Sequence, residues 1–249
     1  MSQTTSVDRA SVARFAAMAD EWWNPAGEFA PLHRLNPARL AFIRETCVEH
    51  FSVDGGVRAP FVGLRLLDVG CGGWLVAEPM TRLGFAVTGI DAGGEAIAVA
   101  DAHAKAIGLT MDYRETTTEA LLAAGERPFD AVLALEVIEH VAEPGAFLKD
   151  CARLLAPGGV MILASLNRTL RSLALAKFAA EYVLRWVPRG AHDWRKFLTP
   201  EEMRGLLREA GLEGGAATGL VLDPVGGRWR RSPDTAINYM LSATHSGAG

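Results

Sequence analysis

The segment 66–73, with the sequence LLDVGCGG, constrains the fold of this chain more than any other feature, together with a second apolar run that ends on Asp91. An apolar strand leads into a glycine turn and a helix, and the next strand ends on a carboxylate. This order is typical of a doubly wound sheet that binds a nucleoside, because glycines let the backbone approach the ligand and the acid accepts hydrogen bonds from ribose hydroxyls. We expect Gly70, Gly72 and Asp91 to bind that nucleoside.

Apolar runs alternate with helical patterns along most of the remaining chain. Strands are expected at 64–69, 86–90, 111–115, 129–135, 160–166, 220–222 and 237–243. Helices are expected between the first five strands, at 75–83, 95–107, 118–124 and 145–155. The residues 157–159, Pro-Gly-Gly, predict a sharp turn before the fifth strand. The alternation predicts an α/β fold with a doubly wound, mostly parallel seven-stranded sheet and helices on both faces.

Helical patterns also precede the first strand and follow the fifth. Helices are expected at 8–23 and 38–51, joined by a loop-rich connector at 24–37. We therefore divide the chain into an N-terminal helical extension, 1–63, and a main domain, 64–249, with a helical insertion at 167–198. Thr199 and Glu202 form a capping-box pattern that predicts the start of one more helix.

Charge and cysteine usage exclude several classes of protein. The chain has 25 basic and 29 acidic residues and no basic block, which argues against a nucleic-acid partner. Its three cysteines lack CxxC spacing, which disfavours a disulfide framework or a structural zinc site. The polar start does not resemble a signal peptide, and no apolar stretch is long enough to cross a bilayer. We expect a cytoplasmic protein.

The glycine loop discriminates between nucleotides. The dinucleotide pattern GxGxxG fails because Leu75 stands where its third glycine is required. The shorter methyltransferase pattern, D-x-G-x-G-x-G, fits Asp68, Gly70 and Gly72 but meets Trp74 at its last position. S-adenosylmethionine has no phosphate, so its site requires no anion cradle. An α/β domain whose glycines only shape a turn is the alternative.

Two glutamates and a histidine follow the fourth strand, at the sheet edge where ligands bind in open parallel sheets. If this segment is helical, Glu136, Glu139 and His140 share one face. Two carboxylates and an imidazole could bind a divalent cation, magnesium or zinc. Alternatively His140 acts as a general base without a metal. Glu136 is the second candidate catalytic residue. A structural role, in which the glutamates cap a helix, is the third interpretation.

The segment 170–187 predicts a helix that contacts lipid. Its polar residues, Arg171, Lys177, Glu181 and Arg185, fall within a narrow arc, and the rest of its surface is apolar and aromatic. A wide apolar face beside a cationic stripe is typical of helices that lie in a membrane interface. A core helix with one solvated stripe is the alternative.

Eight motifs together resemble the ubiquinone-biosynthesis O-methyltransferases. The resemblance covers about residues 12 to 242 and rests on WWNPAGEFAPLH (22–33), NPARL (36–40), LDVGCGG (67–73), EVIEHV (136–141), SLNRT (165–169), AEY (180–182), HDWRKF (192–197) and NYML (238–241). Several of these strings lie outside the general methyltransferase core, which makes the resemblance specific. It implies a class I, Rossmann-like methyltransferase fold and S-adenosylmethionine as the methyl donor.

The resemblance also implies roles for individual residues. Arg39 would contact the donor carboxylate, Gly70 would supply a backbone contact, Asp91 would hold the ribose and Leu135 would lie near the adenosyl group. The positions Glu136, Glu139 and His140 would bind a divalent metal.

The implied acceptors are polyprenylated catechols of the quinone pathway, methylated on a ring hydroxyl. Other enzymes of that pathway are candidate partners, and the inner membrane face is a candidate peripheral location, reached through residues 170–187. Trp74 departs from the family pattern. A methyltransferase-like scaffold, weakened by this indole and binding lipid or pathway partners, is therefore the alternative function.

Overall fold

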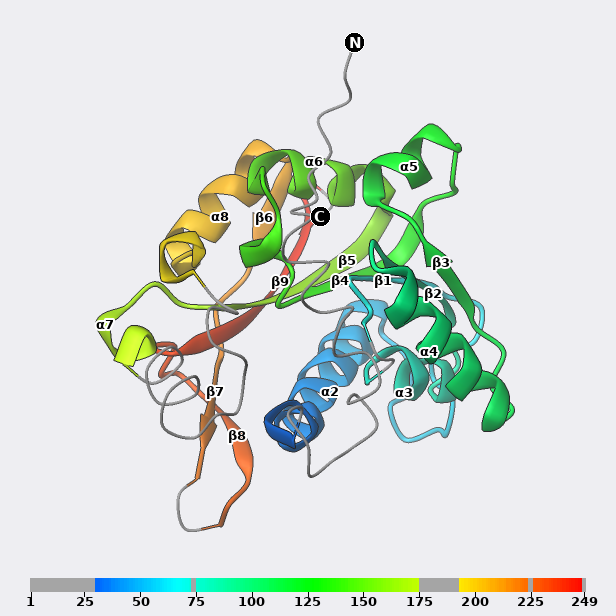
Figure 1. Cartoon of the computed structure of the whole chain (residues 1–249), viewed down its shortest axis with the longest axis horizontal. Helices are drawn as coiled ribbons and strands as arrows, with labels where there is room; N and C mark the ends of the chain where they lie inside the picture. Colours follow the sequence, from blue (N-terminus) through cyan, green and yellow to red (C-terminus); the bar gives the residue numbers. More distant parts are fainter. Residues whose placement is uncertain (1–29, 73–74, 175–192, 224–225, 248–249) are drawn as a thin grey trace.

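The computed structural model describes residues 30–72, 75–174, 193–223 and 226–247 (Figure 1). The predicted helix 8–23, Trp74 and most of the predicted lipid-contacting helix 170–187 lie outside the described residues. None of the helices in the described part of the chain combines the length and apolarity needed to cross a membrane.

A seven-stranded sheet in the order β3-β2-β1-β4-β5-β9-β6 runs through the middle of the molecule (Figure 1). Neighbouring strands from β3 to β5 pair in parallel, whereas β9 pairs antiparallel with β5 and with β6. This arrangement confirms the predicted doubly wound, mostly parallel α/β fold. The strands are β1 (Arg65–Val69), β2 (Ala86–Asp91), β3 (Asp112–Glu115), β4 (Phe129–Leu135), β5 (Leu155–Leu166), β6 (Leu212–Gly214) and β9 (Asn238–His245).

Helices cover both faces of this sheet, and each face has its own apolar core. Side chains alternate along β1, so that Leu67 packs on the face of α6 and α8 while Leu66 packs on the face of α2 and α3. Burial on both faces explains why the parallel strands are apolar throughout. The helices are α2 (Ala30–Phe51), α3 (Ala77–Arg82), α4 (Gly94–Ala106), α5 (Thr118–Ala123), α6 (Pro144–Leu154), α7 (Leu170–Ser172) and α8 (Pro200–Glu209), with 3-10 turns η2 (Ile138–His140) and η4 (Trp194–Lys196).

The start of α2 corrects one prediction. The connector expected at 24–37 is wrong from Ala30 onward, because α2 begins there and contains Pro37. Proline removes a helical hydrogen bond, but Phe42 and Ile43 of the same helix are buried against the sheet. Packing of α2 against the sheet therefore outweighs the helix-breaking effect of Pro37. Since α2 shares a core with β1, the division at residue 63 stays a prediction about sequence organisation.

The fifth strand begins earlier than predicted. The pairing of β4 with β5 passes from Phe129–Leu155 directly to Ala131–Val160, so the intervening residues form a bulge within β5. Gly158 has φ +77°, which a glycine adopts without steric cost. The predicted turn at 157–159 is thus accommodated inside β5 and does not precede it.

The membership of the sheet also differs from the prediction. The strand expected at 220–222 is β7 (Gly219–Leu222), which pairs with β8 (Trp229–Ser232) in a separate hairpin. The seventh strand of the main sheet is β6, which has three residues and was not predicted. The predicted number of strands in the main sheet was right, but β6 takes the place that was predicted for β7. Short strands are specified by the strands they pair with more than by their own composition. The predicted capping box is confirmed: Thr199 and Glu202 cap α8.

Candidate active site

The glycine loop and Asp91 meet where β1 and β2 end side by side. The backbone N–H groups of Gly70 and Cys71 donate to the carbonyl of Ile90, at 2.8 and 3.0 Å. Gly72 N donates to Asp91 Oδ2 at 3.1 Å, and Gly93 N donates to Asp91 Oδ1 at 2.8 Å. Burial raises the pKa of Asp91, and these two hydrogen bonds oppose that shift. The carboxylate is oriented by backbone and keeps lone pairs for a ligand.

Gly70 is required for two independent reasons. Its φ is +67°, in the left-handed region that favours glycine, and Gly72 has φ +47°. A Cβ at Gly70 would also lie 2.5 Å from Cγ2 of Val137. The segment after β4 therefore packs directly on the backbone of the glycine loop. The sequence placed both segments at the carboxyl edge, and the structure brings them into contact.

A buried group of charges lies next to this loop, and we call it the carboxyl-edge cluster: Arg39 from α2, Asp68 from β1, and Glu136 and Glu139 from the segment after β4. Arg39 forms an ion pair with Glu136 and has an exposed fraction of 5%. Burial lowers the pKa of Arg39 to about 10. The cluster offers one arginine to three carboxyl groups, so not every carboxyl group has a cationic partner of its own.

Burial raises the pKa of the two deepest carboxyl groups of this cluster. It raises the pKa of Asp68 to about 7, although the charge of Arg39 opposes the shift. It also raises the pKa of Glu139 to about 7, against a hydrogen bond from the Ser165 hydroxyl, which lies 3.1 Å from Oε2. Both groups therefore hold a proton more readily than an exposed acid does.

Several buried polar atoms lack hydrogen-bond partners among the described residues, and two of them lie on α2: Nε of Arg39 and Oδ1 of Asn36. Asn36 and Arg39 are three residues apart on α2, so they share a helix face. Asn36 Nδ2 donates to the carbonyl of Leu75, just after the loop, at 2.6 Å. A buried donor and acceptor of this kind fit the carboxylate and ammonium groups of an amino acid. With Asp91 for a ribose beside the glycine turn, these residues fit S-adenosylmethionine.

The segment 136–140 does not form the face that would motivate a metal site. Glu136 has φ +52° and precedes the 3-10 turn η2, while Glu139 is buried against Ser165. Within the described ranges, no three His, Cys, Asp or Glu side chains are placed to hold a metal ion. The residues as arranged do not fit a metal, so we derive no chemical step from one. Metal binding by Glu136, Glu139 and His140 stays a prediction.

The remaining predicted residues lie at the same edge. Leu135 ends β4 and is half-buried, and the N–H of the next residue, Glu136, donates to the carbonyl of Ala164 at 2.9 Å. His140 is half-exposed in η2, and its backbone N–H donates to the carbonyl of Val137 at 2.8 Å. Direct contacts join Arg39 to Glu136 and Gly72 to Asp91. Leu135 and His140 lie at this edge because of their positions at the end of β4 and in η2.

Three residues of this region were missed by reasoning from the sequence: Asn36, Asp68 and Ser165. A signal existed for Asp68, since it occupies the acidic position of the glycine-loop pattern. A weaker one existed for Ser165, a polar residue that directly follows the apolar run at the end of a buried strand. Asn36 belongs to one of the recognised motifs, but its role depends on how α2 packs.

Comparisons with known proteins follow this geometry. The family model described as a methyltransferase domain matches residues 28–216. The ubiquinone biosynthesis O-methyltransferase of Caulobacter vibrioides is 59% identical over 96% of this chain and 95% of its own length. The protein of the same name from Cereibacter sphaeroides strain ATCC 17025 is 52% identical over 98% of both chains.

Solved structures resemble the fold at low identity. The magnesium protoporphyrin IX methyltransferase of Synechocystis PCC 6803, crystallised with bound SAH, has a TM-score of 0.67 and 19% identity over 96% of this chain and all of its own. A SAM-dependent methyltransferase of Thermotoga maritima has a TM-score of 0.62 and 16% identity, covering 94% and 99% of the two chains. At these identities the likeness concerns the fold alone.

Proposed function

The chain belongs to the family of ubiquinone biosynthesis O-methyltransferases, and we propose that it transfers the methyl group of S-adenosylmethionine to a ring hydroxyl of a polyprenylated catechol or quinol. Three features at one sheet edge carry this proposal: an oriented Asp91 carboxylate, the left-handed glycine turn at Gly70, and a buried Arg39 whose Nε lacks a hydrogen-bond partner among the described residues. The level of identity to named enzymes supports this function over the scaffold alternative.

Donor binding uses both sides of the glycine loop. Asp91 accepts hydrogen bonds from the ribose hydroxyls, while Gly70 and Gly72 give the loop, through their positive φ angles, the turn that borders the donor. Leu135 borders the adenosyl group from the end of β4. Arg39 receives the donor carboxylate, which competes there with Glu136, its partner in this structure. Donor binding therefore releases Glu136 toward the acceptor side.

Methyl transfer is an in-line displacement. Bound at this edge, the sulfonium supplies an electrophilic methyl group. The acceptor oxygen forms a bond to the methyl carbon, the carbon–sulfur bond breaks, and its electron pair stays on sulfur. His140 takes the hydroxyl proton, and Glu136 stabilises the resulting imidazolium. Alignment of the reacting atoms and exclusion of water supply most of the rate, because the donor is already activated.

The acceptor carries an insoluble polyprenyl tail, and this supports a peripheral location at the inner membrane face. The predicted helix 170–187 would contact lipid there, and other quinone-biosynthesis enzymes would be neighbours. Such a position lets the ring reach the sheet edge while the tail remains in the bilayer.

A methyl-transfer assay on a polyprenylated catechol tests the function. The purified chain with S-adenosylmethionine should form the methyl ether, and His140→Gln should lower kcat while leaving donor affinity intact. Absence of product at saturating donor and acceptor would overturn the proposal. A chelator arm decides the metal prediction separately: activity lost with chelator and restored by magnesium or zinc supports it, and unchanged activity refutes it.

A further inference from the structure

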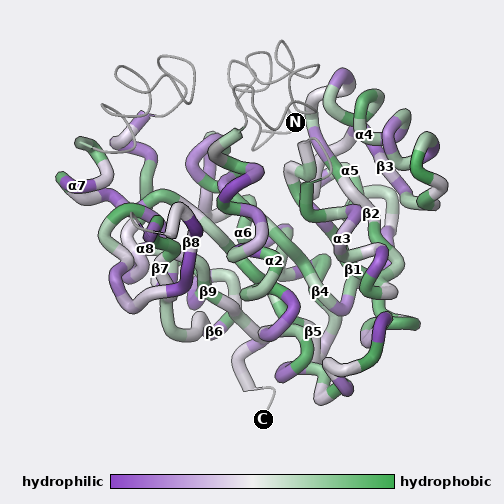
Figure 2. The backbone as a smooth tube through the Cα atoms, turned by 90° about the horizontal axis from the view of Figure 1, so that it is seen from below, coloured by the Kyte–Doolittle hydropathy of each residue, from purple (hydrophilic) through white to green (hydrophobic). Residues whose placement is uncertain are grey.

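Asn167 is a buried polar residue that the mechanism above does not use. It directly follows β5, which is hydrophobic along most of its length (Figure 2). From Asn167 the chain turns into α7, beside the start of β9 (Figure 1). Its exposed fraction is 6%, and its Oδ1 has no hydrogen-bond partner among the described residues. A buried oxygen without a donor costs free energy, so a ligand that supplies the donor is favoured there.

The other polar groups of Asn167 are bonded within the fold. Its backbone N–H donates to the carbonyl of Ile237 at 2.8 Å, and its carbonyl accepts from Thr169 N at 3.0 Å and from the Ser172 hydroxyl. Its Nδ2 donates to the carbonyl of Thr235 at 2.8 Å. Because a carbonyl only accepts, this contact fixes which end of the side-chain amide is the oxygen. The atom left over, Oδ1, therefore requires an O–H or N–H donor.

The position of Asn167 is beside the centre of the proposed reaction. The donor site lies at the ends of β1 and β2, and β4 and β5 follow β1 in the order of the sheet. Asn167 N extends the ladder between β5 and β9, so strand alternation puts Asn167 on the same face as Ser165. The Ser165 hydroxyl donates to Glu139 in η2, the turn that also contains His140. The Cα atoms of Asn167 and Ser165 are at most about 7 Å apart.

We propose that Asn167 binds the acceptor ring, with Oδ1 accepting a hydrogen bond from the hydroxyl next to the one that is methylated. The inference rests on the proposed function, because it assigns a residue to the acceptor of that reaction. A catechol has two adjacent hydroxyls, so one donates to Asn167 while the other gives its proton to His140. This contact orients the ring and determines which hydroxyl meets the methyl group. It also favours a catechol over a phenol, since the unpaired Oδ1 discriminates against a ligand without the second hydroxyl.

Two acceptors test this contact: a catechol that carries one prenyl unit, and the phenol that lacks its unmethylated hydroxyl. Calorimetric titration in the presence of S-adenosylhomocysteine measures the affinity for each without turnover. Wild-type protein should bind the catechol about 10-fold more tightly than the phenol, and Asn167→Leu should abolish most of this preference. In methyl transfer, the wild type should form one methyl ether of the catechol, and Asn167→Leu should form both.

Asn238→Leu is the matched control. Asn238 is half-buried at the start of β9, and its Oδ1 already accepts from the N–H of Leu220 at 2.8 Å. It pairs with Leu166, so its side chain lies on the opposite face of the sheet from that of Asn167. The substitution removes an amide from the same edge and should leave the ratio of the two affinities within about twofold of the wild type.

The outcomes separate this contact from the fold and from catalysis. A loss in Asn167→Leu that is equal for both acceptors means a structural role and overturns the proposal, as does an unchanged preference. If Asn167→Leu fails to bind S-adenosylhomocysteine, Asn167→Ser takes its place, because the shorter side chain does not reach the ring and should lose the same preference. A wild type that binds the catechol but does not methylate it refutes the proposed function and leaves the binding result standing.

Discussion

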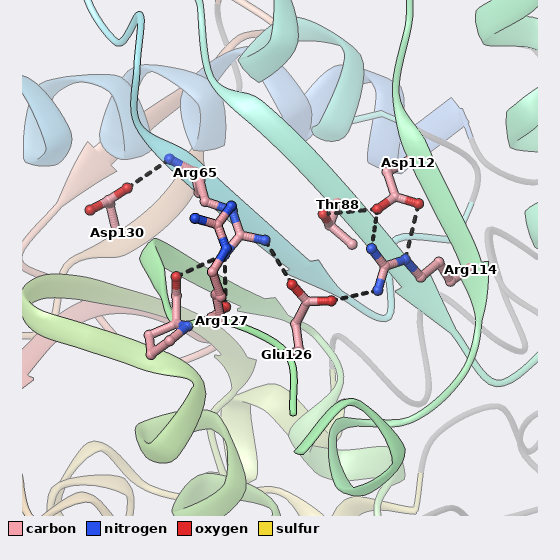
Figure 3. A network of polar contacts seen from close by, with 8 residues as sticks. Arg65, Thr88, Asp112, Arg114, Glu126, Arg127 and Asp130 are labelled. Atoms are coloured by element: carbon pink, nitrogen blue, oxygen red, sulfur yellow. Dashed lines mark hydrogen bonds and ion pairs between the residues drawn. The ribbon is translucent and has the colours of Figure 1, made fainter. Parts of the chain in front are cut away.

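The chain holds two groups of charged side chains along the same sheet, and they differ in how completely they are paired. One set, which we call the amino-edge network after the place of Arg65 at the start of β1, contains Arg65, Asp112, Arg114 and Glu126 (Figure 3). The other set is the carboxyl-edge cluster of Arg39, Asp68, Glu136 and Glu139. Both groups combine arginine with acids, but only the first satisfies its members.

In the amino-edge network, every charge has an opposite partner. Glu126 bridges Arg65 at 2.8 Å and Arg114 at 2.6 Å, and Arg114 also pairs with Asp112. Arg65 donates further to the carbonyls of Arg127 and Pro128. The hydrogen bonds from Arg114 and Arg65 lower the pKa of Glu126. This network joins β1 to β3 and to the turn before β4. Each of its charged groups already has a partner of opposite charge.

The carboxyl-edge cluster has the opposite character. One buried arginine serves three carboxylates, burial raises the pKa of two of them, and Nε of Arg39 lacks a hydrogen-bond partner among the described residues. Such an arrangement costs folding free energy, because buried charges and polar atoms stay incompletely compensated. The comparison teaches that incomplete pairing, more than the presence of charge, distinguishes the edge where we propose that the donor binds.

The largest expected effect comes from the acid that completes the binding edge. Asp91→Ala should weaken donor binding by more than about 100-fold, because each hydrogen bond to a charged group contributes about 1.5–3 kcal/mol and the ribose offers two hydroxyls. Calorimetric titration with S-adenosylmethionine measures this loss. Asp130→Ala, at the amino edge, is the matched control and should leave donor affinity unchanged. An unaltered affinity in Asp91→Ala would refute the ribose assignment.

Arg39→Gln should weaken donor binding by about 30-fold, since removing one partner of a buried charged pair costs about 2 kcal/mol or more. Arg114→Gln removes an arginine from the amino-edge network and should leave the dissociation constant of the donor as it is. The same titration measures both. Equal effects from the two substitutions would erase the functional distinction between the two groups of charges.

The two groups should respond to pH with opposite signs. The pKa of Asp68 is raised to about 7 in the fold, so the folded state keeps a proton that the unfolded chain releases above about pH 4. Its contribution to stability therefore falls as the pH rises from about 4 to about 7. Asp68→Asn should flatten this decline in urea unfolding measured between those values. A variant with the wild-type pH slope would contradict the raised pKa.

The smallest effect is expected at the amino edge. Glu126→Gln should lower the free energy of unfolding by about 1 kcal/mol, the usual scale for ion pairs near the surface. Because the pKa of Glu126 is lowered in the fold, its contribution is present at neutral pH and is lost on acidification. Urea unfolding at neutral and acidic pH checks both points. Any change in donor affinity would show that this network also serves the site.

Local patterns predicted the main fold and the first members of the site. The glycine loop, Asp91 and the acids after β4 follow from spacing, since parallel strands end at a common edge. Asn36 could not be predicted in this way, because its contact with Leu75 depends on α2 packing across 39 residues of sequence. Nor could the raised pKa values of Asp68 and Glu139, which arise from burial in the assembled structure.

The same limit explains the errors in secondary structure. Pro37 is a strong local signal for a helix boundary, and tertiary burial of its neighbours overrides it. The runs that became β6 and β7 are too short to specify their partners, so the sequence could not decide which one joins the main sheet. Thr199 and Glu202 were predicted correctly because a capping box is complete within one turn.

The place of β9 has a consequence for how the molecule is made. Within the described sheet β6 pairs only with β9, and β9 also covers the outer edge of β5. The last strand to be synthesised, β9, therefore lies between β5 and β6, which are both synthesised before it. During synthesis β5 leaves the ribosome as an open, apolar edge that invites pairing with other chains. Until Asn238–His245 emerges, β6 has no strand to pair with, and the edge of β5 stays open.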